Sequence, residues 1–364
     1  ALLLLVLLQA SFAGADVCGK PCLESWEGDC TVPAMGGWGT PIGKGMHVLP
    51  NGTKIEGEFV DGRPVGWGVF TFPNGKRYEG PWVNGEPHGH GVMTWKEGKR
   101  YEGECVKGKM HGQGKIVWPS GEVYYGELHE DREQGIGAFI SSDGVFCGEF
   151  AEGKGQGSVV VNFKDNSTYA GLWNDSEILG LGITTQHGSR VAGRHARAQA
   201  HGLATLSVAG KMIYAGEWEH GSRAGTGTFR GTDRSTFHGQ FHKGQQHGCG
   251  IRTSPGLIWG EHVHHGEFHH GTLLTPQTME GEREAAKRCG WVRKQADTAA
   301  TAAKKEALRA LKVAHDAVDI GHRCQEYAAE GIEFYVQTSR PAEAPYWAVP
   351  HVDLETHHGH HEEL

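Results

Sequence analysis

Residues 78–118 read YEGPWVNGEPHGHGVMTWKEGKRYEGECVKGKMHGQGKIVW, and Tyr-Glu-Gly followed by His-Gly-x-Gly occurs twice in this stretch, with a spacing of 23 residues. Glycine clusters of this kind have two explanations. One is a loop that cradles phosphate in a nucleotide enzyme, and the other is a structural unit that is repeated many times. The number of copies in the whole chain decides between them.

The glycine after Tyr-Glu marks a repeat that continues through most of the chain. Taken as an anchor, it recurs at intervals of 22 or 23 residues. A half unit precedes the first anchor at residues 43–45, and a degraded unit follows from Gly260. So many copies cannot all be nucleotide sites, and a phosphate loop would also need a helix directly after its glycines, so the repeat is structural. The anchors are Gly57, Gly80, Gly103, Gly126, Gly148, Gly171, Gly193, Gly216 and Gly239.

The residues around each anchor alternate as they do in a β-strand. Positions two before and two after the anchor share a face with the glycine, because side chains in a strand point alternately to opposite faces. Each unit is therefore predicted to be a two-stranded hairpin, with Gly-x-Gly between its strands and with an anchor glycine that leaves room for a neighbouring ring. The predicted aromatic face contains Tyr78, Trp82, Trp95, Tyr101, Trp118, Tyr124, Tyr169, Trp173, Tyr214 and Trp218.

The pattern YEGxW…G…HGxG…W…G resembles the MORN repeat (membrane occupation and recognition nexus) over residues 43–275. The resemblance implies a mainly β fold, an elongated single-layer antiparallel meander of about ten hairpins, followed by a C-terminal α-helical segment. MORN repeats bind protein or phospholipid, and in some lysine methyltransferases and lipid kinases they precede a catalytic domain. This chain shows no HRD, DFG, nucleophile-elbow or HExxH motif, so we predict no catalytic residue, no cofactor and no metal.

Two units depart from the pattern. His195 stands where an aromatic residue is expected, and Ala204 stands where the second glycine should be. The unit at Gly148 has a compressed loop, so that its glycines fall at Gly155 and Gly157. Drift without purpose and a bend or partner site are both open explanations for these departures.

The two ends of the sequence resemble sorting signals. Residues 1–15, ALLLLVLLQASFAGA, form a short apolar run that ends in small residues, which is typical of a signal peptide. Three glycosylation sequons also occur. These features predict a glycoprotein of the endoplasmic reticulum lumen or secretory pathway. The sequon asparagines are Asn51, Asn166 and Asn174, and the last four residues, His361, Glu362, Glu363 and Leu364, resemble the retention signals KDEL and HDEL.

Eight cysteines in a secretory chain predict disulfide bonds. Cys18, Cys22 and Cys30 cluster in the N-terminal segment before the repeats (residues 16–42) and are disulfide candidates, with a zinc site as the alternative. Cys105 takes an aromatic slot and Cys147 points to the opposite face, so these two are not expected to pair. The sequence does not choose among the remaining pairings.

After residue 275 the glycine period stops, and residues 276–338 are predicted to be helical. Thr275 would cap the helix, with Pro276 at its first position. Apolar residues, many of them alanine, then recur every three or four positions, and Gly321 is expected to end or kink the helix. An extended, histidine-rich tail follows over residues 339–364.

The role of this helical segment has two explanations. We favour a helix that caps the open edge of the meander, because exposed edge strands aggregate. The alternative is a partner helix, through which, or through the edge strands, the chain could form a homodimer.

The chain has a net charge of −8 and no basic footprint, so nucleic acid is not expected as a partner. His88, His111, His201 and His247 precede loop glycines and are interpreted as loop hydrogen-bonders. Histidine runs at 262–270 and 357–361 could bind zinc or sense acid pH, although solvated histidines are the simpler interpretation.

The function predicted from these features is a non-catalytic scaffold for protein partners. A peripheral phospholipid-binding module and a targeting subunit of an enzyme complex are the alternatives. The repeats carry nearly equal numbers of acidic and basic residues, whereas a surface for anionic lipid should be basic.

Overall fold

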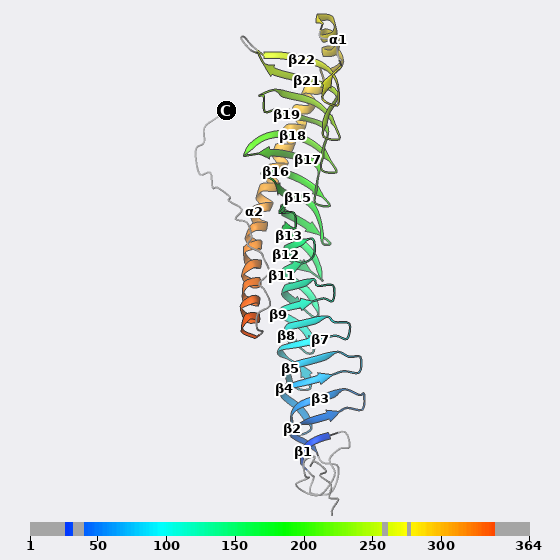
Figure 1. The fold of residues 1–364 in the computed structure, drawn as a ribbon, viewed down its shortest axis with the longest axis vertical. Coiled ribbons are helices and arrows are strands. Elements are labelled where there is room, and N and C mark those ends of the chain that lie inside the picture. Colours follow the sequence, from blue (N-terminus) through cyan, green and yellow to red (C-terminus); the bar gives the residue numbers. More distant parts are fainter. Residues whose placement is uncertain (1–25, 32–39, 257–260, 275–277, 339–364) are drawn as a thin grey trace, which may run out of the picture.

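The computed structural model describes residues 26–31, 40–256, 261–274 and 278–338. One open antiparallel sheet of 23 strands runs along these residues, and two helices follow it (Figure 1). The predicted fold class, a mainly β meander of hairpins with a C-terminal helical segment, is therefore confirmed. The predicted signal peptide, Cys18, Cys22, the anchor proposed at Gly260 and the tail with its retention-like end lie outside the described residues.

Each strand pairs with the strand that follows it in sequence, and β5 pairs with both β6 and β7, which together fill one strand position. Two strands advance the sheet by about 9.6 Å, so each hairpin adds this length to the ribbon. The strands are β1 (Trp26–Thr31), β2 (Thr40–Val48), β3 (Lys54–Val60), β4 (Arg63–Thr71), β5 (Arg77–Val83), β6 (Glu86–Pro87), β7 (Gly89–Thr94), β8 (Arg100–Val106), β9 (Lys109–Val117), β10 (Val123–His129), β11 (Arg132–Ile140), β12 (Gly144–Ala151), β13 (Lys154–Phe163), β14 (Thr168–Asn174), β15 (Glu177–Gln186), β16 (Ser189–Ala196), β17 (Gln199–Val208), β18 (Lys211–Glu219), β19 (Ser222–Arg230), β20 (Thr236–His242), β21 (Gln245–Pro255), β22 (Glu261–His269) and β23 (Thr272–Leu273).

Two-residue turns close the hairpins directly after the anchor strand. At Asn84 and Gly85 the φ angles are 53° and 87°, a combination that matches the right-handed twist of the strands being joined. The prediction that Gly-x-Gly lies between the strands is therefore wrong. Gly89 and Gly91 belong to β7, because the Asn-Gly turn has already reversed the chain.

The anchor glycines and the second glycines face one another across the strands and form a continuous row. Gly68 is opposite Gly80, and Gly91 is opposite Gly103. Near the C-terminal end of the sheet Gly266 takes the row position, opposite Gly250. We call these positions the glycine row, and only Val159 and Ala204 interrupt it between Gly45 and Gly266.

The glycine row leaves space for aromatic rings. A Cβ atom placed on Gly91 would lie 2.6 Å from Cε2 and 2.7 Å from Cζ of Tyr78, and one on Gly80 would lie 2.7 Å from the same Cζ. These separations are shorter than van der Waals contact, so the Tyr78 ring occupies the space that two side chains would need. Where the chain has Val191 instead of an aromatic residue, Ala204 stands in the row.

The tyrosine hydroxyls complete this packing. Tyr78 Oη donates to the carbonyl oxygen of Pro81 at 3.1 Å, and Tyr101 Oη donates to that of Glu104 at 2.6 Å. Burial raises the pKa of both hydroxyls, which stay neutral donors. Because a buried hydroxyl needs a partner, the bond to the carbonyl three residues ahead favours tyrosine at this slot. The same bond recurs at Tyr124, Tyr169 and Tyr214.

Two helices, α1 (Met279–Cys289) and α2 (Val292–Thr338), follow the sheet. The predicted cap at Thr275 is not the one observed, because Thr278 Oγ1 accepts from the backbone N–H of Gly281 at 3.1 Å. The chain breaks between the helices at Gly290, so the single long helix that was expected is divided. Among the described helices, neither has a stretch long and apolar enough to cross a bilayer.

Helix α2 continues through Gly321, where an end or a kink was expected. A Cβ atom on Gly321 would lie 3.1 Å from Cγ2 of Val160 on β13. The glycine therefore serves a close approach of the helix to the sheet. It does not terminate the helix.

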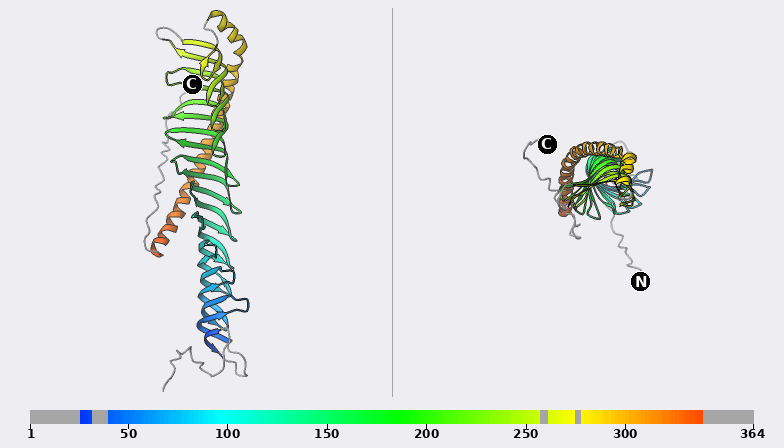
Figure 2. Two further views of the ribbon diagram at one scale, coloured as in Figure 1. Left: turned by 45° about the vertical axis from the view of Figure 1, so that its right-hand side comes forward. Right: turned by 90° about the horizontal axis from the view of Figure 1, so that it is seen from above.

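Helix α2 lies along one face of the sheet and packs on β10 to β21, while α1 packs on β21 and β22 (Figure 1). Seen from above, α2 curves around the ribbon (Figure 2). The favoured interpretation, a helix that caps the open edge, is therefore wrong for α2. We call the face under α2 the outer face and the face that carries the aromatic rings the inner face.

Small residues form the contact between α2 and the outer face. Ala303 and Ala310 of the helix are fully buried, and Ala192 and Ala215 of the sheet are 6% and 2% exposed. Alanine side chains let the helix backbone approach the strands closely. Each alanine buries little apolar area, so the interface gains modest hydrophobic free energy per residue.

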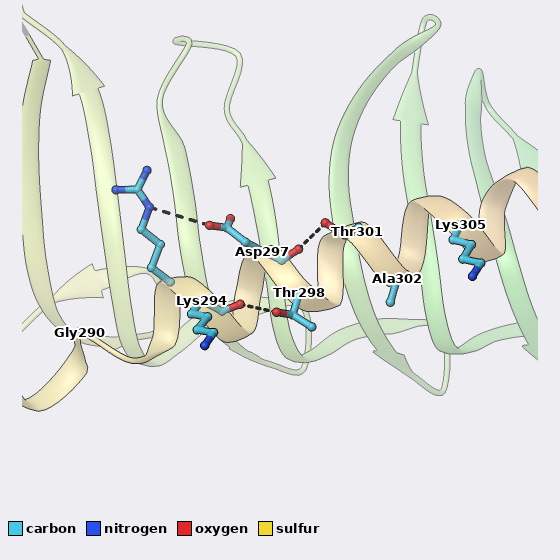
Figure 3. A pocket seen from close by; sticks show the side chains of 8 residues that line it. Gly290, Lys294, Asp297, Thr298, Thr301, Ala302 and Lys305 are labelled. Carbon is cyan, nitrogen blue, oxygen red and sulfur yellow. Dashed lines mark hydrogen bonds and ion pairs between the residues drawn. The ribbon is translucent and has the colours of Figure 1, made fainter. Parts of the chain in front are cut away.

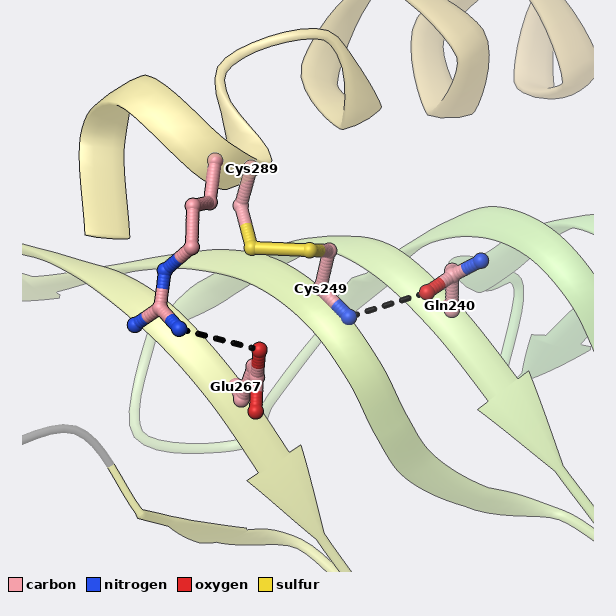
Figure 4. The surroundings of a disulfide bond; sticks show 5 residues. Gln240, Cys249, Glu267 and Cys289 are labelled. Atoms are coloured by element: carbon pink, nitrogen blue, oxygen red, sulfur yellow. Dashed lines mark hydrogen bonds and ion pairs between the residues drawn. A yellow bond between two sulfur atoms is a disulfide. The ribbon is translucent and has the colours of Figure 1, made fainter. Parts of the chain in front are cut away.

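Two disulfide bonds fasten the helices to the outer face. Cys147 on β12 is bonded to Cys324 on α2, with their Cα atoms 5.7 Å apart. Cys249 on β21 is bonded to Cys289 at the end of α1, with a Cα separation of 5.2 Å (Figure 4). As expected, Cys105 and Cys147 do not pair, and Cys105 is buried with a free thiol.

Next to the second disulfide, the backbone N–H of Cys249 donates to the side-chain oxygen of Gln240 at 2.9 Å. Arg288 of α1 forms an ion pair with Glu267 of β22 at 3.6 Å (Figure 4). These contacts hold α1 against the last full hairpin of the sheet.

Candidate interaction surface

Most aromatic residues of the inner face are buried in the core and are not available to a partner. Tyr78, Tyr101, Tyr124 and Tyr169 are completely buried. The rings pack edge to face along the ribbon, as Tyr124 does against Phe150, with centroids 5.1 Å apart. Trp82, Trp173, Tyr214 and Trp218 are also buried, whereas Trp95 and Trp118 are partly exposed.

Trp95 and Trp118 lie on one rim of the ribbon, at the point where the second strand of a hairpin gives way to its turn. Lys99 Nζ lies 5.1 Å from the ring centroid of Trp95 and 5.6 Å from that of Trp118. Lys76 Nζ lies 5.0 Å from the Trp95 ring, and burial lowers the pKa of this amine. The lysines cover the ring faces by cation–π contact, so this rim presents ammonium groups over aromatic rings.

The outer face changes character where α2 ends. We call β2 to β8, which lie beyond the strands that α2 packs on, the open half. Two outer-face arginines are paired within their strands, since Arg77 contacts Glu79 at 2.9 Å and Arg100 contacts Glu102 at 2.7 Å. Residues 40–106 hold equal numbers of acidic and basic residues. The open half therefore offers a polar and charge-balanced outer face.

The middle residue of Gly-x-Gly differs between the open half and the part of the sheet under α2. It points to the outer face, because its two glycine neighbours are one position away on a strand. In several hairpins under α2 this residue is apolar or cross-linked, as at Ile136, Leu181 and Cys249. In the open half it is exposed and polar at His90, and the same holds at Gln113 on the adjoining strand β9.

Trp67 is the exception to this rule. It is the middle residue of Gly66-Trp67-Gly68 on β4 and lies opposite Pro81 on β5. Its side chain is 60% exposed, although it has the large apolar surface that other strands cover with α2. Tryptophan is enriched among residues that dominate binding energy, so Trp67 is a candidate contact residue.

His195, which replaces an aromatic residue of the repeat, is a buried neutral imidazole. It is 2% exposed and stacks edge to face against Tyr169, with ring centroids 5.3 Å apart. Its Nδ1 lies 3.2 Å from the carbonyl oxygen of Gly193, and its Nε2 lies 2.9 Å from Thr184 Oγ1. The carbonyl can only accept, so Nδ1 carries the proton and Nε2 accepts from the threonine hydroxyl.

Burial lowers the pKa of His195 to about 4, against a smaller upward effect of the hydrogen bond to Gly193. Unfolded chains therefore take up a proton as the pH falls below about 6.5, while the folded chain does so only near the lower value. We expect this residue to contribute a loss of about 3 kcal/mol of stability between pH 6.5 and 4. His195→Leu, which installs the residue type found at the same slot as Leu128, should make the decline in melting temperature with acidification shallower. Equal slopes for the two proteins would contradict this assignment.

Of the four histidines that precede the first glycine of Gly-x-Gly, His111, His201 and His247 pack against other histidines. The His111 and His129 ring centroids are 4.7 Å apart, and those of His201 and His220 are 5.6 Å apart. His247 contacts His269 at 5.1 Å, which lies in the histidine run at 262–270. In the described parts of the chain, no group of three or more histidine, cysteine, aspartate or glutamate side chains is arranged to hold a metal ion.

The remaining predicted positions are placed as follows. Asn51, Asn166 and Asn174 are all exposed on turns or at strand ends. Cys30 is on β1, and its pairing with Cys18 or Cys22 falls outside the described residues. The disulfides to Cys289 and Cys324 were not predicted, although Cys147 and Cys249 both sit at outer-face positions of their strands.

Comparison with known proteins identifies repeats of one family in part of the chain. The MORN repeat model matches residues 56–77, 78–100, 101–123, 214–236 and 237–256. Curated proteins give no match. Among solved structures, the TCP domain of SAS-4 (dCPAP) of Drosophila melanogaster, in complex with a proline-rich motif of Ana2 (dSTIL), is 12% identical. The match covers 45% of this chain and 83% of that chain with a TM-score of 0.27, and a likeness at this level says nothing of what this chain binds.

The matched segments coincide with hairpins of the ribbon, and the unmatched hairpins between them share its register and its glycine row. The chain is similar to MORN repeats over residues 56–123 and 214–256.

Proposed function

We propose that the chain is a non-catalytic scaffold of the endoplasmic reticulum lumen or secretory pathway, which binds a protein partner through its open half. The observation that carries this proposal is Trp67, a 60% exposed tryptophan on the outer face of the open half, where Val60 and Val83 are also about half exposed. Helix α2 occupies the outer face of the other half. MORN repeats serve in general as interaction modules, which agrees with this function.

The charge of the open half favours a protein over an anionic membrane. Arg77 and Arg100 are each neutralised by a glutamate on the same strand. Each lysine or arginine near an anionic membrane contributes about 1 kcal/mol to binding. A side chain already paired with a carboxylate contributes less. A protein partner can match paired charges with its own polar rim and place an apolar residue on the tryptophan.

A matched pair of tryptophan variants tests this function. Trp67→Ala should remove specific co-purifying proteins when the chain is isolated from its source membranes and analysed by mass spectrometry. Trp291→Ala, at a 46% exposed tryptophan near the start of α2, should leave them in place. Retention of the same partners by both variants would overturn the assignment to the open half. Flotation that follows lipid type in both variants would favour the lipid alternative.

The proposed compartment is supported by two disulfide bonds and three exposed sequon asparagines, because disulfides persist in oxidising compartments. Deleting Glu362 to Leu364 should release the protein into the culture medium, since the retention tetrapeptide is read by a receptor. A chain lacking only Val352 to Leu354 is the control and should remain inside the cell. Continued retention of the first variant would remove the case for the tetrapeptide.

A further inference from the structure

The sheet and helix α2 enclose a cleft at the C-terminal half of the ribbon, far along the chain from Trp67. It has a volume of about 880 Å³ and is bounded by β18, the turn between β19 and β20, and α2. This size falls in the range of clefts that bind small molecules. On the helix the lining residues include Asp297, Thr301 and Lys304, whose spacing of four and three residues places them on one side of α2.

Positive charge gathers in this cleft. The sheet wall contributes Lys211, Arg230 and Arg234, and the helix wall contributes Lys304. All four side chains are exposed, and within the described residues none of them forms an ion pair. The chain as a whole has a net charge of −8, so this concentration is not a general property of its surface.

The one carboxylate in the cleft already has partners. Asp297 Oδ1 lies 2.8 Å from Nδ1 of His238 on β20, and its Oδ2 lies 3.9 Å from Nε of Arg293. In the nearby turn, Asp233 is not part of the lining and accepts from the backbone N–H of Ser235 at 2.9 Å. Neither carboxylate forms an ion pair with any of the four cations.

The cleft also has an apolar part. Val208 and Met212 are 38% and 41% exposed beside the cations, and Ala215 and Ala300 are buried beneath them. A ligand that suits these walls has several negative charges for the cations and a carbon skeleton for the apolar patch. Lysine and arginine together are suited to phosphate and sulfate oxygens.

We propose that this cleft binds a small organic molecule that carries more than one phosphate or sulfate group. Lys304 holds the ligand from the helix side, and Arg230 and Arg234 hold it from the turn. Because residues of α2 form one wall, the ligand also bridges helix and sheet and adds a contact between the two layers.

Inorganic tripolyphosphate is the probe for this site, because it supplies adjacent phosphate groups without a base or lipid. The test variant is Arg234→Gln with Lys304→Gln. The matched control is Lys294→Gln with Lys305→Gln, which removes the same charge from the same helix region. Lys294 and Lys305 line a separate, neighbouring pocket together with Asp297 and Thr301 (Figure 3), and neither lysine belongs to the cleft lining.

Calorimetric titration at low salt should show tripolyphosphate binding to the parent chain, at least tenfold weaker binding to the test variant and less than a twofold change in the control. No binding by the parent chain, or equal losses in the two variants, would overturn the proposal.

Co-sedimentation with vesicles that contain a phosphoinositide in phosphatidylcholine separates the sources of phosphate. If only the test variant loses vesicle binding, the phosphate belongs to a lipid headgroup. If vesicle binding is the same in both variants, the phosphate belongs to a soluble molecule. An unchanged melting temperature of both variants shows that the fold is intact.

Discussion

A chain in which Cys147 and Cys324 are both replaced by serine is expected to lose about 2–5 kcal/mol of unfolding free energy. The bond joins residues 177 positions apart, so its removal releases a large loop in the unfolded chain. The contact that remains between α2 and the sheet rests largely on alanines such as Ala310 and Ala314, which bury little area each. The helix therefore depends on its cross-links more than a leucine-rich helix would.

Hydrogen exchange locates this effect. In the variant, amides of α2 near residue 324 should exchange faster, while amides next to the remaining Cys249–Cys289 bond keep their protection. Cys105→Ala is the matched control, because it removes a buried thiol that is not cross-linked, and it should leave the protection of α2 unchanged. Unchanged exchange along the whole of α2 in the double-serine variant would show that the disulfide does not hold the helix.

Gly91→Ala is expected to destabilise the chain by about 1–3 kcal/mol, because the new methyl group would enter the space of the buried Tyr78 ring. The Cβ atom would lie 2.6 Å from Tyr78 Cε2, and the ring is completely buried and cannot move aside freely. Thermal or denaturant unfolding measures the loss. Gly57→Ala should cost less, because Ile55 replaces the tyrosine there and the nearest atoms are 3.2 Å away.

A double-mutant cycle assigns this loss to the ring. In a Tyr78→Leu background, Gly91→Ala should cost much less than in the parent chain, giving a coupling free energy of about 0.5–3 kcal/mol. The chain contains a natural counterpart of this double change, with Val191 in the ring slot and Ala204 in the glycine row. Additive effects would mean that the glycine serves the backbone and not the ring.

The ribbon could be predicted from the sequence because one physical requirement recurs in most units. The ring of Tyr78 occupies the space that side chains at two glycine positions would need. Units with such a ring therefore have glycine at the same two positions of the repeat. The position of Gly-x-Gly was predicted wrongly because only its glycine content was considered. The Asn84-Gly85 turn, four and five residues after the anchor, already closes the hairpin.

The position of α2 was not predicted because only the inner face was read for periodicity. The outer-face residues indicate where the helix packs. They are charged in the open half, as at Glu79 and Glu102, and small under α2, as at Ala138, Ala192 and Ala215. An alanine-rich helix fits against such a surface. Trp67 also lies on this face, so the candidate interaction surface was overlooked for the same reason.

The disulfides follow from the same geometry. Cys289 and Cys324 are separated by 35 residues, which is about 52 Å along a helix. Cys147 on β12 and Cys249 on β21 are nine strand spacings apart, or about 43 Å. A helix that runs back along the ribbon at an oblique angle can span the sheet distance between Cys147 and Cys249 with the longer helix distance between Cys289 and Cys324. Both disulfide bonds can therefore form in the same molecule.

Mapping the disulfide bonds by mass spectrometry of a non-reduced digest tests this arrangement most directly. Peptides containing Cys147 and Cys324 should be cross-linked, and so should those containing Cys249 and Cys289. Cys105 should be alkylated only after unfolding. A bond between Cys289 and Cys324, or between Cys105 and any helix cysteine, would contradict a helix that runs back along the outer face of a glycine-lined ribbon.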